Sequence, residues 1–113
     1  MSNEKTYDDF WLGYLQEHSQ RPTRLLHYVG ISATVVSIVA AIATETWWLA
    51  VVGIAIGYLA AWTAHYTFQH NIPVMFKGPK SALWSLISAL RMYTLGLSGQ
   101  LGPELRRAGI ETG

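Results

Sequence analysis

Length, composition and charge already narrow the class of protein. The chain has 113 residues, enough for one small domain. Half of its residues are hydrophobic and 13% are charged, against about 25% charged residues in an ordinary soluble domain. The net charge of +1 comes without a basic cluster, which argues against a nucleic-acid-binding protein. The chain has no cysteine, so it can form neither disulfides nor thiolate metal sites.

The first predicted element is an amphipathic helix over residues 6–18. Its aromatic and leucine residues recur at helical spacing, and the acidic Asp8 and Asp9 suit the positive end of a helix dipole. Residues 19–22 end this helix, and Pro22 is well placed to begin the next one. We expect the helix to lie along a membrane surface and to carry His18 at its C-terminal end.

Two long apolar arms follow and predict a transmembrane hairpin. Between residues 25 and 76 the only formal charge is Glu45. The arms, residues 22–43 and 47–69, each match the ~20 residues that a helix needs to span a bilayer, and the polar break between them predicts a tight turn. Glycines in the second arm, Gly53 and Gly57, predict a close-packed hairpin seam or an oligomer contact. A compact soluble helical bundle is the alternative, which the long uncharged arms disfavour.

The remaining chain predicts two further helices, the first of them at the membrane. Residues 81–97 are mostly apolar but contain Arg91, which favours a re-entrant or interfacial helix over a full span. A turn-rich connector precedes a short polar helix at residues 103–108. The expected fold is therefore all-α, with residues 1–113 forming a single integral membrane domain. All basic residues lie away from the hairpin tip, so the positive-inside rule places both termini in the cytoplasm: Lys5, Arg21, Arg24, Lys77, Lys80, Arg91, Arg106 and Arg107.

The four histidines converge on the open end of the predicted hairpin. His27 lies 18 residues before Glu45 and His65 lies 20 residues after it, so two antiparallel helices bring both to nearly the same depth. His18 and His70 flank the same end. Histidines without cysteines favour iron, zinc or copper over a metal that prefers thiolates. The spacing predicts a metal or proton-handling site and names no reaction, and capping of helix ends is the structural alternative for each histidine.

Short blocks of residues along nearly the whole chain resemble one known family. The blocks are Tyr14-x3-His18, Arg24-x2-His27-x2-Gly30, Gly57-Tyr58, Ala61-Trp62-x2-His65, Asn71-x-Pro73-x2-Phe76, Trp84-Ser85-Leu86 and Arg91-Met92-Tyr93. In this order, over about residues 10–107, they resemble the small membrane 2-hydroxy fatty acid dioxygenases. The eukaryotic members of that family act in fatty acid α-oxidation during phytosphingosine breakdown.

The resemblance implies a ferrous-iron enzyme of the endoplasmic reticulum or the bacterial inner membrane. Such an enzyme uses dioxygen to shorten a 2-hydroxy fatty acid by one carbon, with the acyl chain in an apolar groove between helices. The resemblance implies His18, His27 and His65 as catalytic iron ligands. Further candidates are His70 as a metal ligand, Tyr14, Gln69 and Asn71 as ligands or neighbours of ligands, and Arg24, Lys77, Lys80 and Arg91 as partners of the substrate carboxylate. For the basic residues, contact with lipid headgroups is the plain alternative.

Two positions depart from the family pattern. Gln69 and Ala89 stand where the family typically has acidic residues, and missing carboxylates would weaken or alter a metal site unless His70 substitutes for them. Two other functions therefore stay open. The first is a membrane protein that binds zinc, or haem between His27 and His65. The second is a lipid-binding or structural membrane protein without enzymatic activity, and a homo-oligomer is a further hypothesis.

Overall fold

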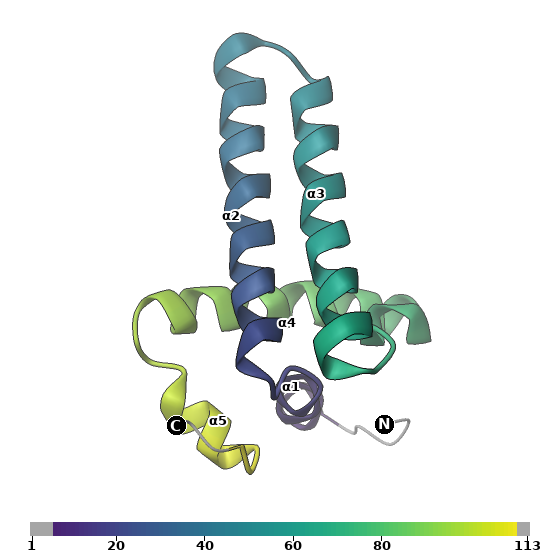
Figure 1. Cartoon of the computed structure of the whole chain (residues 1–113), viewed down its shortest axis with the longest axis vertical. Helices are drawn as coiled ribbons and strands as arrows, with labels where there is room; N and C mark the ends of the chain where they lie inside the picture. Colours follow the sequence, from purple (N-terminus) through teal and green to yellow (C-terminus); the bar gives the residue numbers. More distant parts are fainter. Residues whose placement is uncertain (1–5, 111–113) are drawn as a thin grey trace. The chain divides into compact units, whose positions relative to one another are not determined.

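The computed structural model describes residues 6–110, and every regular element within this range is helical (Figure 1). The all-α prediction is therefore confirmed for this range. In chain order the elements are α1 (Tyr7–Gln16), α2 (Arg21–Thr44), α3 (Trp48–Ala64), the π-helix η1 (His65–Gln69), the 3-10 helix η2 (Val74–Lys77), α4 (Pro79–Leu97) and α5 (Gly102–Arg107). Lys5 lies outside the described residues.

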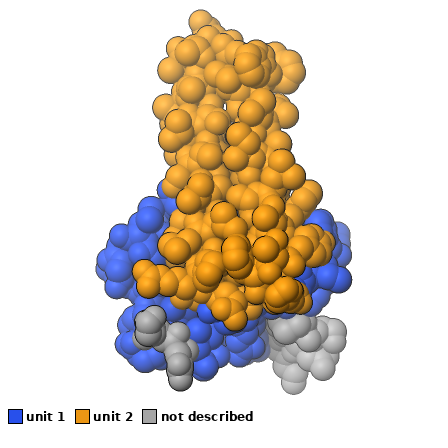
Figure 2. Space-filling model, viewed as in Figure 1, with its two compact units in different colours: residues 1–19, 71–113 blue, residues 20–70 orange. Residues whose placement is uncertain are grey.

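The chain divides into two compact units, coloured separately in Figure 2. Residues 20–70 form the hairpin unit, which consists of α2, α3 and η1. Residues 1–19 and 71–113 form the terminal unit, which holds α1, η2, α4 and α5.

In the hairpin unit, α2 and α3 run antiparallel, side by side (Figure 1). Pro22 lies in the first turn of α2, where its missing N–H costs nothing. At the other end Glu45 adopts a left-handed conformation (φ 55°), and Thr46 N donates to Ala41 O at 2.9 Å. This C-cap ends α2 and reverses the chain into α3. The two helices thus lie at the positions that the apolar arms predicted.

Small residues allow the backbones of α2 and α3 to approach closely. A Cβ atom on Gly30 would lie 3.1 Å from Gly57 O, and a Cβ on Gly53 would overlap the side chain of Ser37. Beside them, the Thr34 hydroxyl lies 2.7 Å from Gly53 O and 3.0 Å from Gly30 O. Gly53 and Gly57 therefore belong to the hairpin seam, one of the two roles that their spacing predicted.

The other faces of α2 and α3 are apolar and exposed. Both spans, Arg21–Thr44 and Trp48–Gln69, are long and apolar enough to cross a membrane by length and composition, and 17% of the residues in the apolar window of each are buried. Large apolar side chains that are more than half exposed occur along both helices: Val29, Val36, Val39, Ile42, Trp48, Val51 and Leu59.

In the terminal unit, α1 packs against α4 and α5. Its core contains the fully buried Trp11 and Leu15 of α1 and Met92 of α4. The rings of Trp84 on α4 and Phe10 on α1 meet edge to face, with centroids 5.4 Å apart. The amphipathic face predicted for the first helix is thus buried against the C-terminal helices of its own unit.

Glu104 on α5 joins the three helices of the terminal unit. Its Oε1 accepts hydrogen bonds from Trp11 Nε1 at 2.8 Å, Arg107 Nη1 at 2.9 Å and Arg91 Nη2 at 3.3 Å. The Arg91 guanidinium also lies over the Trp11 ring, 4.3 Å from its centroid. Arg107 Nη2 also donates a hydrogen bond to Asp8 Oδ2 on α1 at 2.9 Å. This hydrogen bond is the largest cause of the raised pKa of Arg107, ahead of the charge of Glu104.

The largest departure from the predicted elements is at the end of the second apolar arm. The expected helix over residues 47–69 is α-helical only to Ala64, and its last turn is the π-helix η1. This turn closes when the backbone N–H of His70, in a left-handed conformation, donates to His65 O. The bounds of the other helices lie within two residues of the expected ones, a difference that is usual for helix ends that fray.

Candidate metal centre

The hairpin unit brings His27 and His65 together. His27 lies two turns into α2, and His65 directly follows α3. Their rings meet edge to face, with centroids 5.3 Å apart and an interplanar angle of 84°. Both side chains are buried, with exposed fractions of 6% and 2%. Two imidazoles from opposite arms of the hairpin therefore lie next to each other.

A backbone carbonyl fixes the orientation and tautomer of His27. Its Nδ1 lies 2.8 Å from Thr23 O, one helical turn earlier on α2. A carbonyl oxygen can only accept, so Nδ1 carries a hydrogen, which in the neutral imidazole leaves the lone pair on Nε2. Metal-binding histidines commonly donate their second ring N–H to a carbonyl in this way.

His18 repeats this arrangement in the terminal unit. Its Nδ1 lies 2.7 Å from Tyr14 O, again four residues earlier, and its ring stacks on the Tyr14 ring at a centroid distance of 4.0 Å. The side chain is 1% exposed. A neutral His18 therefore also has its lone pair on Nε2, and Tyr14 contacts it through both its carbonyl and its ring.

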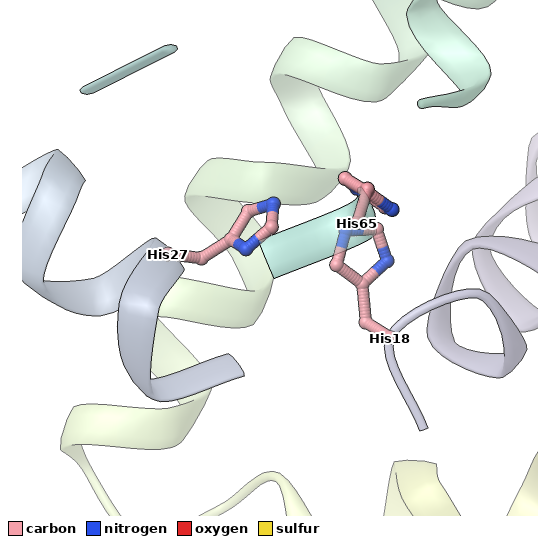
Figure 3. Close-up of side chains that lie close together, drawn as sticks. All are labelled: His18, His27 and His65. Carbon is pink, nitrogen blue, oxygen red and sulfur yellow. The ribbon is translucent and has the colours of Figure 1, made fainter. Parts of the chain in front are cut away.

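His18, His27 and His65, drawn as sticks in Figure 3, form a buried group that could hold a metal ion. Each offers one ring nitrogen, and these three atoms lie within 4.8 Å of one another. Two imidazole nitrogens on one ion, each ~2.1 Å from it, are at most ~4.2 Å apart. Three imidazoles suit iron(II), zinc or copper.

His70 and Gln69 occupy different environments. His70 is exposed at the end of η1 and is not a member of the buried group. Gln69 Oε1 accepts hydrogen bonds from Thr23 Oγ1 at 3.0 Å and from Gln20 N at 3.1 Å. Gln69 therefore contacts the residue whose carbonyl holds His27. The role of Thr23 has no sequence signature, because its carbonyl is a group that every residue has.

Most of the basic candidates make contacts within the terminal unit. Lys77 Nζ pairs with Glu17 at 3.5 Å, Arg91 with Glu104, and Lys80 Nζ lies 4.3 Å from the centroid of the Trp84 ring. Asn71 Nδ2 donates to Glu17 O at 3.2 Å. Arg24 is buried in the first turn of α2. A role for any of these residues in binding a substrate carboxylate stays a prediction.

The fold and the site together define a class: an all-helical protein with two helices of bilayer length and a buried histidine group able to hold a metal. A family model described as 2-hydroxy-palmitic acid dioxygenase Mpo1-like matches residues 4–101. The match covers most of the chain, which therefore belongs to this family. No curated protein and no solved structure matches the chain.

Proposed function

We propose that the chain is an iron-dependent dioxygenase that shortens 2-hydroxy fatty acids by one carbon, with His18, His27 and His65 as iron ligands. The observation that carries the proposal is the buried group of three imidazoles, two of them held by Nδ1 hydrogen bonds to backbone carbonyls. The family description supplies the reaction class. When bound, ferrous iron provides the redox chemistry through which dioxygen reacts with a 2-hydroxy acid.

The protein's own residues orient the metal ligands and bind the substrate. The carbonyls of Tyr14 and Thr23 hold two imidazoles in the tautomer with the lone pair on Nε2, and burial of the histidines would keep bulk water from a metal bound there. Arg24 is the preferred partner for the substrate carboxylate, because it lies three residues before His27, on the same side of α2. Lys77 and Arg91, engaged with carboxylates of the terminal unit, are second choices.

The proposal includes a membrane location. In it, α2 and α3 span the bilayer of the endoplasmic reticulum or the bacterial inner membrane, with both termini in the cytoplasm. The helix α4 lies in the interface, because exposed leucine and isoleucine side chains recur along it at helical spacing while Ser88 and Met92 are buried. The exposed residues are Leu83, Leu86, Ile87, Leu90 and Leu97.

Elemental analysis tests the proposal first. The full chain, with its His27→Ala and His65→Ala variants, is purified anaerobically in detergent from cells grown with iron, without chelator. We expect about one iron per chain in the wild type and none in either variant. His70→Ala is the matched control, because His70 is exposed and outside the histidine group. Metal-free wild type, or metal that survives both changes, would overturn the proposal.

The activity assay follows with 2-hydroxypalmitate and dioxygen, and mass spectrometry should detect a product one carbon shorter. A protein that binds iron but gives no such product would be a metal-binding membrane protein instead. Zinc in place of iron would also be read directly from the elemental analysis.

Haem between His27 and His65 is disfavoured by the seam beside them. Gly30 lies three residues after His27, and a single added carbon there would already lie 3.1 Å from Gly57 O. Backbones this close leave no slot for a porphyrin between α2 and α3 on that side of the histidines. We therefore expect no Soret band in the purified protein.

A further inference from the structure

The π turn η1 carries two functional groups of the hairpin unit, one at each end. His65 begins the turn and Gln69 ends it. π-Helical turns are rare and occur frequently at functional sites, because the extra residue redirects side chains. Here the redirected turn closes at His70, whose N–H donates to His65 O. At the other end of the turn, Gln69 contacts the start of α2.

Gln69 fixes the first turn of α2. Its Oε1 accepts a hydrogen bond from the Thr23 hydroxyl at 3.0 Å and one from the backbone N–H of Gln20 at 3.1 Å. Gln20 is the N-cap residue of α2, and N–H groups at a helix start have no partner within the helix. One amide oxygen thus ties the end of η1 to the start of the neighbouring helix.

Thr23 links Gln69 to His27 by hydrogen bonds. The residue is completely buried, and its hydroxyl and carbonyl have different partners. Its hydroxyl donates to Gln69, while its carbonyl accepts the hydrogen of His27 Nδ1 at 2.8 Å. A continuous series of hydrogen bonds therefore runs from the last residue of the π turn to the imidazole of a candidate metal ligand.

We infer that Gln69 and Thr23 are positioning residues for the metal ligand His27. The π turn orients both ligands of the hairpin: His65 directly, as its first residue, and His27 through the hydrogen bonds of Gln69 and Thr23. This inference rests on the proposed metal site. It assigns Gln69 an indirect role, because its oxygen is bound to Thr23 and Gln20 and acts on the metal only through His27.

The experiment titrates cobalt(II) into the metal-free, detergent-solubilised full chain and records visible ligand-field absorption together with the Kd. Thr23→Val removes the hydroxyl but keeps the carbonyl that holds His27, and Gln69→Met removes the acceptor at similar length. We expect each change to weaken cobalt binding by about 10–100-fold, as is typical for neighbours of metal ligands, and to shift the absorption bands. Thr23→Ser and Gln69→Glu restore the missing group and should restore both properties.

Thr34→Val is the matched control. The Thr34 hydroxyl also bonds across the hairpin, to Gly53 O, but lies about two turns farther along α2 than His27. We expect this variant to bind cobalt like the wild type, with unchanged bands.

The possible results separate the inference from the proposed function. Wild type that binds cobalt while Thr23→Val and Gln69→Met bind it equally well would overturn the inference and leave the metal site standing. Equal loss of cobalt and of helical circular dichroism in Thr23→Val and Thr34→Val would also overturn it, since the effect would then be general. Wild type that binds no cobalt or iron would overturn the metal site itself.

Discussion

His27 and His65 meet edge to face, 5.3 Å between ring centroids, although they belong to opposite arms of a hairpin whose turn lies at Glu45. Neither helix alone could create this pair. It depends on the small-residue seam that keeps α2 and α3 in close contact and in register. The placement of the two candidate metal ligands therefore depends on the packing of α2 against α3.

The first prediction concerns the ligands themselves. Replacement of His18, His27 or His65 by alanine should abolish metal retention and lower turnover of 2-hydroxypalmitate by more than about 100-fold, because losing a ligand costs more than losing its neighbour. Metal per chain and product formation are the measurements. His70→Ala should keep both within about twofold of the wild type, and its loss of metal would mean that the exposed histidine joins the site.

The second prediction concerns the seam. Gly53→Leu should destabilise the hairpin by about 1–3 kcal/mol, because the added side chain must overlap Ser37 in a tightly packed interface. Denaturant-induced loss of helical circular dichroism in mixed micelles measures this change. Ala55→Leu adds a similar side chain at an exposed position on the same helix, so its stability should stay close to that of the wild type.

The sequence predicted what depends on local pattern. The apolar runs located α2 and α3, and counting residues from Glu45 placed His27 and His65 at one depth. It missed the π turn, because periodicity cannot register one extra residue in a single turn. It also gave no sign that Arg91 contacts Glu104 and Trp11, because such long-range contacts leave no trace in spacing; a role of Arg91 toward the substrate stays a prediction. The role of the Thr23 carbonyl could not be predicted from the sequence either, because every residue has a backbone carbonyl.

The departure at Gln69 also has a structural interpretation. The hydrogen bonds from Thr23 and Gln20 require only an acceptor oxygen, and the amide supplies one as a carboxylate would. The amide therefore makes the contact with Thr23 without placing a negative charge beside the site.

The third prediction concerns Glu104. Glu104→Ala should destabilise the protein by about 1–3 kcal/mol, because it leaves the N–H of the buried Trp11 without its acceptor. Glu104→Gln can keep that hydrogen bond through its amide oxygen and should cost less. Asp8→Ala breaks the exposed pair with Arg107 and removes an acidic group from the first turn of α1, so we expect the smallest loss of the three, and one that shrinks further in high salt. Equal losses in all three variants, measured by denaturant unfolding, would contradict this ranking.

The fourth prediction concerns the hairpin tip. The chain has no cysteine, so a single introduced thiol is a unique label site. If the arms span the bilayer, Glu45→Cys should react with a membrane-impermeant maleimide from outside intact cells. Arg106→Cys, exposed on α5, should react only after the membrane is opened. The opposite pattern would invert the topology, and reaction of both thiols in intact cells would mean that the arms do not span.

The last prediction tests the interfacial position of α4. Its exposed apolar residues recur at spacings of three and four, which puts Leu83, Leu86 and Leu90 on one face of the helix. In reconstituted bilayers, spin labels at Leu86→Cys and Leu90→Cys should be accessible to dissolved oxygen and protected from a water-soluble nickel complex. A label at Arg106→Cys should show the reverse and serves as the control. Moderate depth, within about 5–10 Å of the headgroup boundary, would fit an amphipathic interfacial helix. Labels near the bilayer centre would instead mean that α4 is re-entrant, and labels freely accessible to nickel would mean that lipid does not cover this face.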